Sequence, residues 1–322
     1  MNYGFEALVS EVPAQRVDIA ALVREAGLDD EVLERLYAGG LKRVPVDEEA
    51  TLVEMVRQAV VRLVERVEGL VHRTHGILFA HSLPVLAPAE MSFLDACLER
   101  LHLDAVPRIA VTGQPCSILH MAIRLAGDWL NEAPPHTGIL LIGGDKAYSA
   151  EERIFFNSAM GDAVVAGFVT RGAAVHRILA CVSDTKLFAC QGEYSAPERI
   201  AQFRSNSPAL VRDTVERCLA SGGVTLSDLT YIVPHTPYHQ MWDTFGTFLR
   251  FPLERILTRY LGETGHLNSN DSLVHYVQAV KEGIINSGDL ALLINPGFGG
   301  TRGCTLILKG PHAGSYSSSS SA

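Results

Sequence analysis

The sequence lacks any long apolar run. No stretch reaches the ~20 consecutive apolar residues that a membrane-spanning helix needs, and the longest apolar runs have the length of strands. The amino terminus, residues 1–6, has no basic segment followed by an apolar one, so we expect no secretory signal. We therefore expect a cytoplasmic protein without a membrane partner.

Cysteine and basic charge are also scarce. The six cysteines are scattered, and no pair has the short spacing of a zinc knuckle or a redox motif. We expect reduced thiols and no metal site. The formal net charge of −9 argues against a nucleic-acid partner, because phosphate binding needs a basic face.

The residues that are present predict a large layered core. The chain has 322 residues, 47% of them hydrophobic, enough for two domains or one duplicated domain. Residues 49–67 show helical spacing, while 76–81 and 138–144 are apolar runs typical of buried strands. Residues 162–170 and 303–309 suggest two later strands that pair with each other. This alternation predicts an α/β architecture.

Cys116 lies where a strand gives way to a helix. Residues 108–112 favour a strand, and from Ser117 the apolar residues recur at three- and four-residue spacing. A thiol at a helix N-terminus faces unpaired N–H groups and the positive end of the helix dipole, which favour the thiolate. Cys116 is therefore a candidate nucleophile, with a small buried apolar residue as the alternative.

His235 follows a second junction of the same kind, at residues 226–235. Because functional groups gather beyond the carboxyl ends of strands in α/β sheets, Cys116 and His235 could meet across a duplicated fold. The alternative is an ordinary core or surface histidine.

Five motifs in order carry a family resemblance. Cys116 at a helix start is followed by Gly161–Val165, Val233–His235, Gly265–Ser272 and Asn295–Gly303. This order resembles the β-ketoacyl-acyl carrier protein synthase III branch of the thiolase superfamily.

The resemblance implies a thiolase fold, with duplicated βαβαβ halves in a five-layered αβαβα sandwich, and a homodimer. The amino-terminal half, 1–172, would carry the cysteine, and the carboxyl-terminal half, 173–312, the histidine and an Asp or Asn. Residues 313–322 form a Ser-rich tail that we expect to be disordered.

The resemblance also implies roles for the site residues. Cys116 would take an acyl group from a thioester, and His235 would act as the base beside the sulfur. The backbone N–H of Cys116 and the glycine loop would form the oxyanion hole. That loop is Gly297, Phe298, Gly299 and Gly300, and its alternative is a plain turn before the last strand.

One motif departs from the family. Condensing members have Gly-Asn-Thr where this chain has Gly265-His266-Leu267, so His266 is a possible alternative to the family asparagine. Asn268 could take that place only if the loop shifts by two residues. The pattern of a histidine followed by Asp271 resembles a divergent acyltransferase subgroup with a Cys, His and Asp triad. Asp271 would then orient His235, unless it caps the helix expected near Ser272.

The acyl donor would be a thioester on the phosphopantetheine of an acyl carrier protein or on coenzyme A, with no tightly bound cofactor. Coenzyme A is in doubt because Tyr37, which lies in the matching region, has no tryptophan beside it. Arg250, Arg255 and Arg259 are expected on one helix that docks the acidic carrier protein. A solvated helix face is the alternative.

These observations favour an acyltransferase that loads Cys116 and passes the acyl group to a hydroxyl or amine of a small natural-product intermediate. A carboxylate near the site stabilises an imidazolium but opposes the enolate of a decarboxylation. The alternative is a decarboxylative C–C condensing synthase of fatty-acid or polyketide biosynthesis. A third hypothesis is a non-catalytic partner subunit of a heteromeric synthase.

Overall fold

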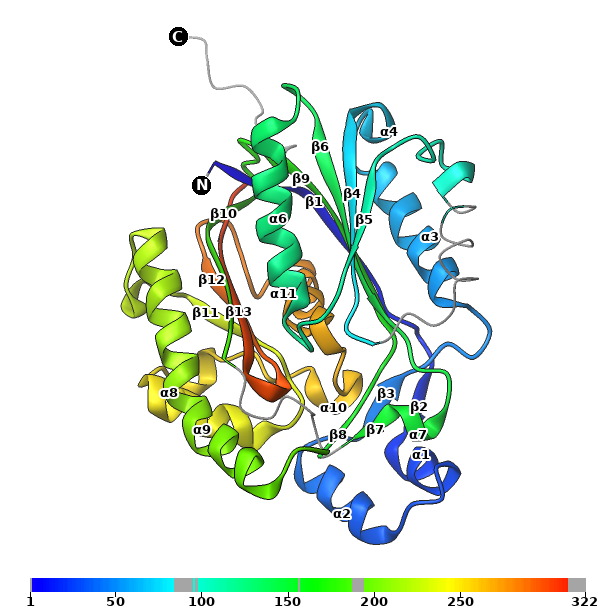
Figure 1. Ribbon diagram of the computed structural model, residues 1–322, viewed down its shortest axis with the longest axis vertical. Coiled ribbons are helices and arrows are strands. Elements are labelled where there is room, and N and C mark those ends of the chain that lie inside the picture. The colour runs from blue at the N-terminus through cyan, green and yellow to red at the C-terminus, as the bar shows by residue number, and fades with distance from the viewer. Residues whose placement is uncertain (1, 84–94, 96–97, 156, 187–193, 312–322) are drawn as a thin grey trace.

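A nine-stranded sheet forms the body of the protein (Figure 1). The computed structural model describes residues 2–83, 95, 98–155, 157–186 and 194–311. In spatial order the strands are β11 (Tyr231–Pro234), β12 (Leu290–Pro296), β13 (Thr301–Lys309), β10 (His176–Thr185), β1 (Tyr3–Glu11), β9 (Ala163–Arg171), β6 (Gly138–Asp145), β4 (Thr74–Ala80) and β5 (Arg108–Val111). The expected Ser-rich tail, residues 313–322, lies outside the described residues.

The sheet bends around two inner helices, α6 (Ile118–Glu132) and α11 (Asp271–Lys281). β1 and β10 join its two halves through only three residue pairs. One buried cluster contains both inner helices together with Leu141 from one half of the sheet and Leu293 from the other. Figure 1 shows α6 and α11 between the two halves.

Outer helices cover the remaining faces. α3 (Leu52–Val64) packs on β4, β6 and β9, whereas α8 (Pro197–Gly222) and α9 (His239–Leu249) pack on β11, β12 and β13. The order of layers is αβαβα, which is the five-layered thiolase fold expected from the sequence.

Small residues on α6 allow this helix to lie close to the strands on either side of it. Its apolar residues face both halves of the sheet, and Ile118, Ala122 and Ala126 are buried. A Cβ atom added at Gly127 would lie 2.3 Å from the ring of Tyr3. Small residues at these contacts let the helix approach the sheet, which sets the position of its N-terminus.

Among the larger elements the order of strand, outer helix, strand, inner helix and two strands occurs twice along the chain, with β5 as an additional strand before α6 in the first repeat. β9 and β13 end the two repeats, and the prediction that they pair with each other is wrong. β9 pairs with β1 and β6, and β13 pairs with β10 and β12. The boundary at residues 172 and 173 falls between β9 and β10, and the division into two halves there stays a prediction.

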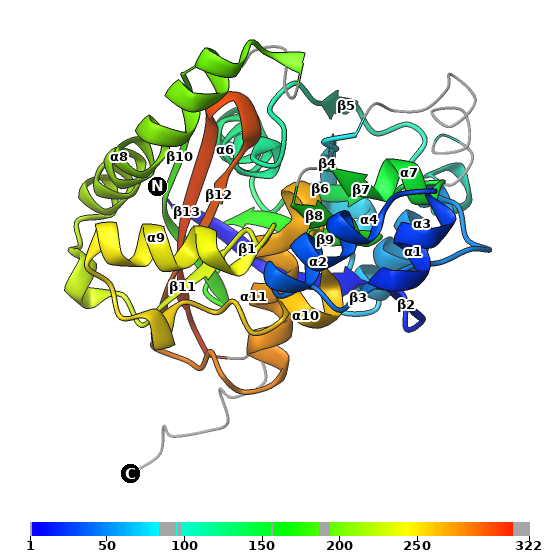
Figure 2. The same cartoon turned by 90° about the horizontal axis from the view of Figure 1, so that it is seen from below.

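Short elements gather at the end of the molecule where both inner helices begin (Figures 1 and 2). They are α1 (Ile19–Glu25), α2 (Asp30–Ala38), α7 (Ala150–Arg153), α10 (Leu261–Thr264), β2 (Arg16–Asp18), β3 (Arg43–Pro45), β7 (Ile154–Phe155) and β8 (Ser158–Ala159). At the opposite end, α4 (Leu70–Arg73) precedes β4. Among the described residues no helix combines the length and the apolar composition needed to span a bilayer.

Candidate active site

Cys116 occupies a sharp bend between β5 and α6. Its φ of 60° lies in the left-handed region, which is unusual for a residue other than glycine. Its side chain is 7% exposed. The Cys116 N–H donates to Ser82 Oγ at 3.3 Å, and Asn295 Nδ2 donates to the Cys116 carbonyl at 2.8 Å. The structure therefore places Cys116 just before a helix N-terminus, with its backbone held on both sides.

His266 and Asp271 approach the sulfur from the second half of the chain. Cys116 Sγ lies 3.6 Å from His266 Nε2, and His266 Nδ1 lies 2.6 Å from Asp271 Oδ2. A 3₁₀ turn at Asn268–Asn270 brings the carboxylate back toward the imidazole five residues earlier. Sulfur, imidazole and carboxylate thus form a buried line of hydrogen-bonding groups.

The histidine and the carboxylate stabilise each other's charge. Burial alone would lower the pKa of His266, but the Asp271 carboxylate and the nearby sulfur raise this pKa to about 10. Burial alone would raise the pKa of Asp271, but the charge on His266 lowers it to about 2. Near neutral pH the pair is an imidazolium and a carboxylate.

His235 also lies beside Cys116 and His266. Its ring stands edge-on to His266 with centroids 4.5 Å apart, and the donor and acceptor atoms of Cys116, His235 and His266 all lie within 4.8 Å of one another. Burial and the charge on His266 keep the pKa of His235 well below its ordinary value. Neither ring nitrogen of His235 has a hydrogen-bond partner among the described residues.

The expectation that Asp271 orients His235 is therefore corrected: Asp271 orients His266. Asp271 Oδ1 accepts the Leu267 N–H at 2.7 Å, which closes the short loop back onto His266. Asp271 Oδ2 reaches the end of β11 only through the backbone, where it accepts the Thr236 N–H at 3.0 Å. The short loop from His266 to Asp271 closes back on itself, which brings the Asp271 carboxylate to His266 rather than to His235.

Asn268, the second residue considered for the place of the family asparagine, makes its side-chain hydrogen bond away from Cys116. Its side-chain amide donates to Met160 Sδ at 3.2 Å, and its φ of 55° belongs to the turn before α11. His266 occupies the place next to Cys116 instead.

The glycine loop, residues 297–300, packs against the backbone of the bend at Cys116. A Cβ atom added at Gly297 would lie 1.9 Å from the Pro115 carbonyl oxygen. The Gly297 N–H donates to the Thr301 carbonyl at 2.7 Å, and the Gly300 N–H to that of Gly297 at 3.4 Å. The oxyanion role of residues 297–300 stays a prediction.

A cavity of about 370 Å³ leads to Cys116, His235 and His266. Both halves of the chain contribute to it, and most of its wall is aromatic or apolar. Its aromatic lining consists of Phe155, Phe203, Tyr238, Phe245 and Phe298. Such a lining suits an acyl chain or an aromatic acceptor better than a charged one.

Sequence reasoning missed the residues that hold the loops around Cys116. Asp145, at the end of β6, accepts the N–H groups of Ser82 and Leu83 at 2.7 and 2.9 Å. Its other oxygen accepts from Ser269 Oγ and Asn270 Nδ2. Burial raises the pKa of Asp145 to about 7. The sequence offered one signal for Asp145, because it is a carboxylate at the end of an apolar strand, where functional groups gather.

The three arginines expected on one docking helix lie on separate elements. Arg250 ends α9 with a φ of 58°, because Pro252 follows two residues later and disfavours continuation of the helix. Arg255 lies in a 3₁₀ turn, where Nε donates to the Thr230 carbonyl. Arg259 lines a different cavity.

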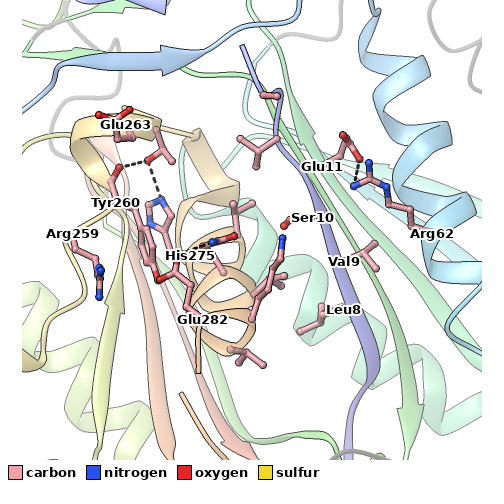
Figure 3. Close-up of a pocket in the computed structure, with 18 of the residues that line it drawn as sticks. Leu8, Val9, Ser10, Glu11, Arg62, Arg259, Tyr260, Glu263, His275 and Glu282 are labelled. Atoms are coloured by element: carbon pink, nitrogen blue, oxygen red, sulfur yellow. Dashed lines mark hydrogen bonds and ion pairs between the residues drawn. The ribbon is translucent and has the colours of Figure 1, made fainter. Parts of the chain in front are cut away.

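That second cavity, of about 1080 Å³, lies between β1 and the segment around α10 and α11 (Figure 3). The ion pair of Glu11 with Arg62 lies on one side, and Arg259 and Tyr260 lie on the other. None of Cys116, His235 or His266 lines it. Although it is larger, it lacks the groups that the smaller cavity brings together.

Comparisons with known proteins show which proteins this chain is similar to. Residues 219–309 match the family model described as 3-oxoacyl-[acyl-carrier-protein] synthase III C terminal. The β-ketoacyl-[acyl-carrier-protein] synthase III of Synechocystis sp. is 31% identical over 99 residues, which is 31% of this chain and 30% of that relative. The chain therefore covers about 30% of the length of the curated relatives that it matches.

Solved structures match over nearly the whole chain. ChlB3, described as an acyltransferase, has a TM-score of 0.82 at 19% identity, covering 97% of this chain and 99% of its own. The synthase III of Aquifex aeolicus VF5 has a TM-score of 0.78 at 18% identity, covering 95% and 99%. At these identities the structures show the fold. Together with the family match over residues 219–309, they show that the chain has the fold of the β-ketoacyl-acyl carrier protein synthase III proteins.

Proposed function

We propose that this protein is an acyltransferase in which Cys116, His266 and Asp271 act as a catalytic triad. The observation that carries the proposal is the line from Cys116 Sγ through His266 to Asp271, with separations of 3.6 and 2.6 Å. A carboxylate that orients a histidine beside a nucleophile is the arrangement that generates and recovers that nucleophile in acyl transfer.

In the loading step, the Cys116 thiolate attacks the carbonyl carbon of an acyl thioester. The carbon–sulfur bond to the donor breaks, and the donor thiol leaves with the proton held on His266 Nε2. Asp271 keeps Nδ1 protonated throughout, so Nε2 is the nitrogen that exchanges protons.

In the transfer step, neutral His266 takes a proton from a hydroxyl or amine as its oxygen or nitrogen attacks the acyl-cysteine. The new ester or amide leaves, and Cys116 returns as a thiolate beside a protonated His266. Each step breaks one bond to the acyl carbon and forms another, with no oxidant or metal required.

The decarboxylative alternative is weaker because of the group that replaces the family asparagine. Decarboxylation develops an enolate, which neutral or cationic donors stabilise. Asp271 adds a carboxylate 2.6 Å from His266, and the amide of Asn268 contacts Met160 instead. The non-catalytic hypothesis is weaker still, because a subunit without chemistry does not need an assembled triad.

Intact-protein mass spectrometry tests the proposal. The wild-type chain is mixed with acyl and malonyl thioesters on coenzyme A, on a pantetheine mimic and on a carrier protein. We expect a mass gain equal to the acyl group in the wild type and none in Cys116→Ala. Cys181→Ala is the matched control, because burial raises the pKa of that thiol to about 12 and keeps it unreactive. Absence of an adduct with every donor would refute the proposal.

The loaded enzyme is then offered an alcohol, an amine and a malonyl carrier in turn. Release of an ester or amide supports the acyltransferase, whereas release of carbon dioxide with a new C–C bond supports the condensing enzyme. A hydroxyl or amine as the acyl acceptor, and a carrier protein or coenzyme A as the acyl donor, belong to the same proposal.

Carrier docking and dimerisation also remain proposals. Replacing Arg250, Arg255 and Arg259 with Glu should slow loading from a carrier protein but not from a pantetheine mimic, and equal slowing with both donors would contradict docking there. Among the described residues β5 is an outer strand of the sheet, with Ile109 51% exposed. Such an edge could pair with a second copy of the chain.

A further inference from the structure

Three good metal-ligand groups converge at the end of the smaller cavity. Cys116 Sγ and one nitrogen of each of His235 and His266 all lie within 4.8 Å of one another, and all three side chains are buried. Thiolate and imidazole are the ligand types that Zn²⁺ prefers. No short spacing in the sequence indicates this set, because the three residues come from distant segments.

The separation between sulfur and nitrogen fits zinc. A tetrahedral ion with Zn–S near 2.3 Å and Zn–N near 2.05 Å holds these two ligand atoms about 3.6 Å apart. Cys116 Sγ and His266 Nε2 are already 3.6 Å apart. Only His235 has to approach, and its ring is already edge-on to His266.

Asp271 supplies the support that a zinc-binding histidine usually has. It accepts a hydrogen bond from His266 Nδ1 at 2.6 Å, which leaves Nε2 facing the sulfur. Carboxylate, histidine and zinc commonly form such a chain, and the carboxylate makes the imidazole a stronger ligand. The charges also balance, because Zn²⁺ would offset the Cys116 thiolate and the Asp271 carboxylate.

His235 provides an independent sign that a ligand belongs here. Its side chain is 4% exposed and lines the cavity, yet neither ring nitrogen has a partner among the described residues. A buried polar atom without a partner is costly and calls for a binding partner.

We propose that Cys116, His235 and His266 form a Zn²⁺ site and that bound Zn²⁺ reversibly blocks acyl loading of Cys116. The fourth position of the ion faces the cavity, which gives both an entry path and room for a water molecule. Binding replaces the proton shared by Cys116 and His266, so each zinc ion bound releases a proton to solvent. Zinc and the acyl group exclude each other because both need the same sulfur.

Cobalt substitution tests the site without any variant. Co²⁺ added to the metal-free wild-type chain should give the intense thiolate-to-cobalt absorption of a bound cysteine and the visible bands of a tetrahedral ion. Prior alkylation of Cys116 should abolish both. A cobalt spectrum without the thiolate absorption would overturn the proposal, because the sulfur would then not be a ligand.

Equilibrium dialysis with Zn²⁺ identifies the other ligands. We expect one ion per chain, with Kd raised at least about 100-fold in Cys116→Ala, His235→Phe and His266→Phe. Asp271→Asn should weaken binding about 10- to 100-fold, as for other carboxylates behind a zinc histidine. Cys181→Ala should bind as the wild type does. Equal affinity in wild type and His235→Phe would exclude His235 and overturn the three-ligand site.

Zinc should also stop the mass gain from acyl thioesters in the wild type, and a chelator should restore it. The binding measurements need no acyl substrate, so they separate this inference from the proposed function. A chain that binds zinc but never forms an acyl adduct would refute the acyltransferase and leave the metal site standing. Loading that is unaffected by saturating zinc would refute the block.

Discussion

The two inner helices, α6 and α11, begin at the same end of the molecule, and each follows a residue other than glycine with a positive φ. These residues are Cys116, with φ 60°, and Asn268, with φ 55°. The Cys116 side chain faces the cavity, whereas the Asn268 amide turns to Met160. The reactive groups of the second bend are its neighbours, His266 and Asp271.

The comparison shows that one backbone geometry, a positive φ before an inner helix, presents different side chains in the two halves. A left-handed backbone costs a residue other than glycine roughly 1–2 kcal/mol, and such strain concentrates at functional sites. At the first bend the strained residue is Cys116, the proposed nucleophile. At the second, asparagine tolerates the conformation, and the turn that it allows brings Asp271 against His266. In the proposed mechanism one half supplies the sulfur, and the other supplies the histidine and the carboxylate that transfer the proton.

The largest expected effect on the rate of acyl loading comes from removing the charge of Asp271, which follows the second bend. Asp271→Asn cannot stabilise a charged His266 and allows the wrong tautomer, so the rate of acyl loading should fall about 10³- to 10⁴-fold. His235→Gln should slow loading far less. Rates come from the appearance of the adduct by quenched mass spectrometry. A larger loss in His235→Gln than in Asp271→Asn would restore His235 as the base.

Asn295 connects the two bends, so its removal should come next. Its amide donates to the carbonyls of Cys116 and Ser269 at 2.8 and 3.2 Å, and its oxygen accepts from Ser272 and His120. Asn295→Ala leaves these buried groups unpaired, which should lower the free energy of unfolding by about 1–3 kcal/mol. Loading should slow about 10- to 100-fold as both bends shift.

Urea denaturation and single-turnover loading measure these two effects. Unchanged loading in a destabilised Asn295→Ala protein would show that the residue serves only the fold. Asn286→Ala is the control, because its side-chain amide donates within an exposed turn.

The ion pair of His266 and Asp271 should also make the free energy of unfolding depend on pH. The pKa of Asp271 falls on folding from 3.8 to about 2, and that of His266 rises from 6.5 to about 10. The stabilisation is fully present between about pH 4 and pH 6.5. It is lost as pH falls through about 2 or rises through about 10. The gap in unfolding free energy between wild type and His266→Gln should therefore narrow from pH 6 to pH 10, and a constant gap would contradict the ion pair.

The smallest effect is expected at Asn268. Since its amide contacts Met160 rather than the sulfur, Asn268→Gly should keep the positive φ and change loading less than about threefold. Asn268→Ala adds strain at that φ and separates backbone from side-chain effects. If Asn268→Gly impairs turnover more than Asp271→Asn does, the condensing hypothesis gains over the acyltransferase.

Local patterns were enough to predict part of the site. Apolar residues at helical spacing after Ser117 placed Cys116 at the start of α6, because periodicity and helix termini depend on neighbours in sequence. The αβαβα layers followed from the resemblance and are confirmed. The helix through Arg250, Arg255 and Arg259 was wrong, although Pro252 offered a signal that the helix ends.

By itself the sequence determined the position of Cys116 just before a helix, the layered fold and the presence of a histidine and a carboxylate near position 270. Only the tertiary structure decided that Asp271 holds His266 rather than His235, and that β9 and β13 lie in different halves of the sheet. Contacts of this kind depend on how a turn closes and which strands adjoin. Those outcomes follow from packing of segments far apart in the chain, which spacing along the sequence does not specify.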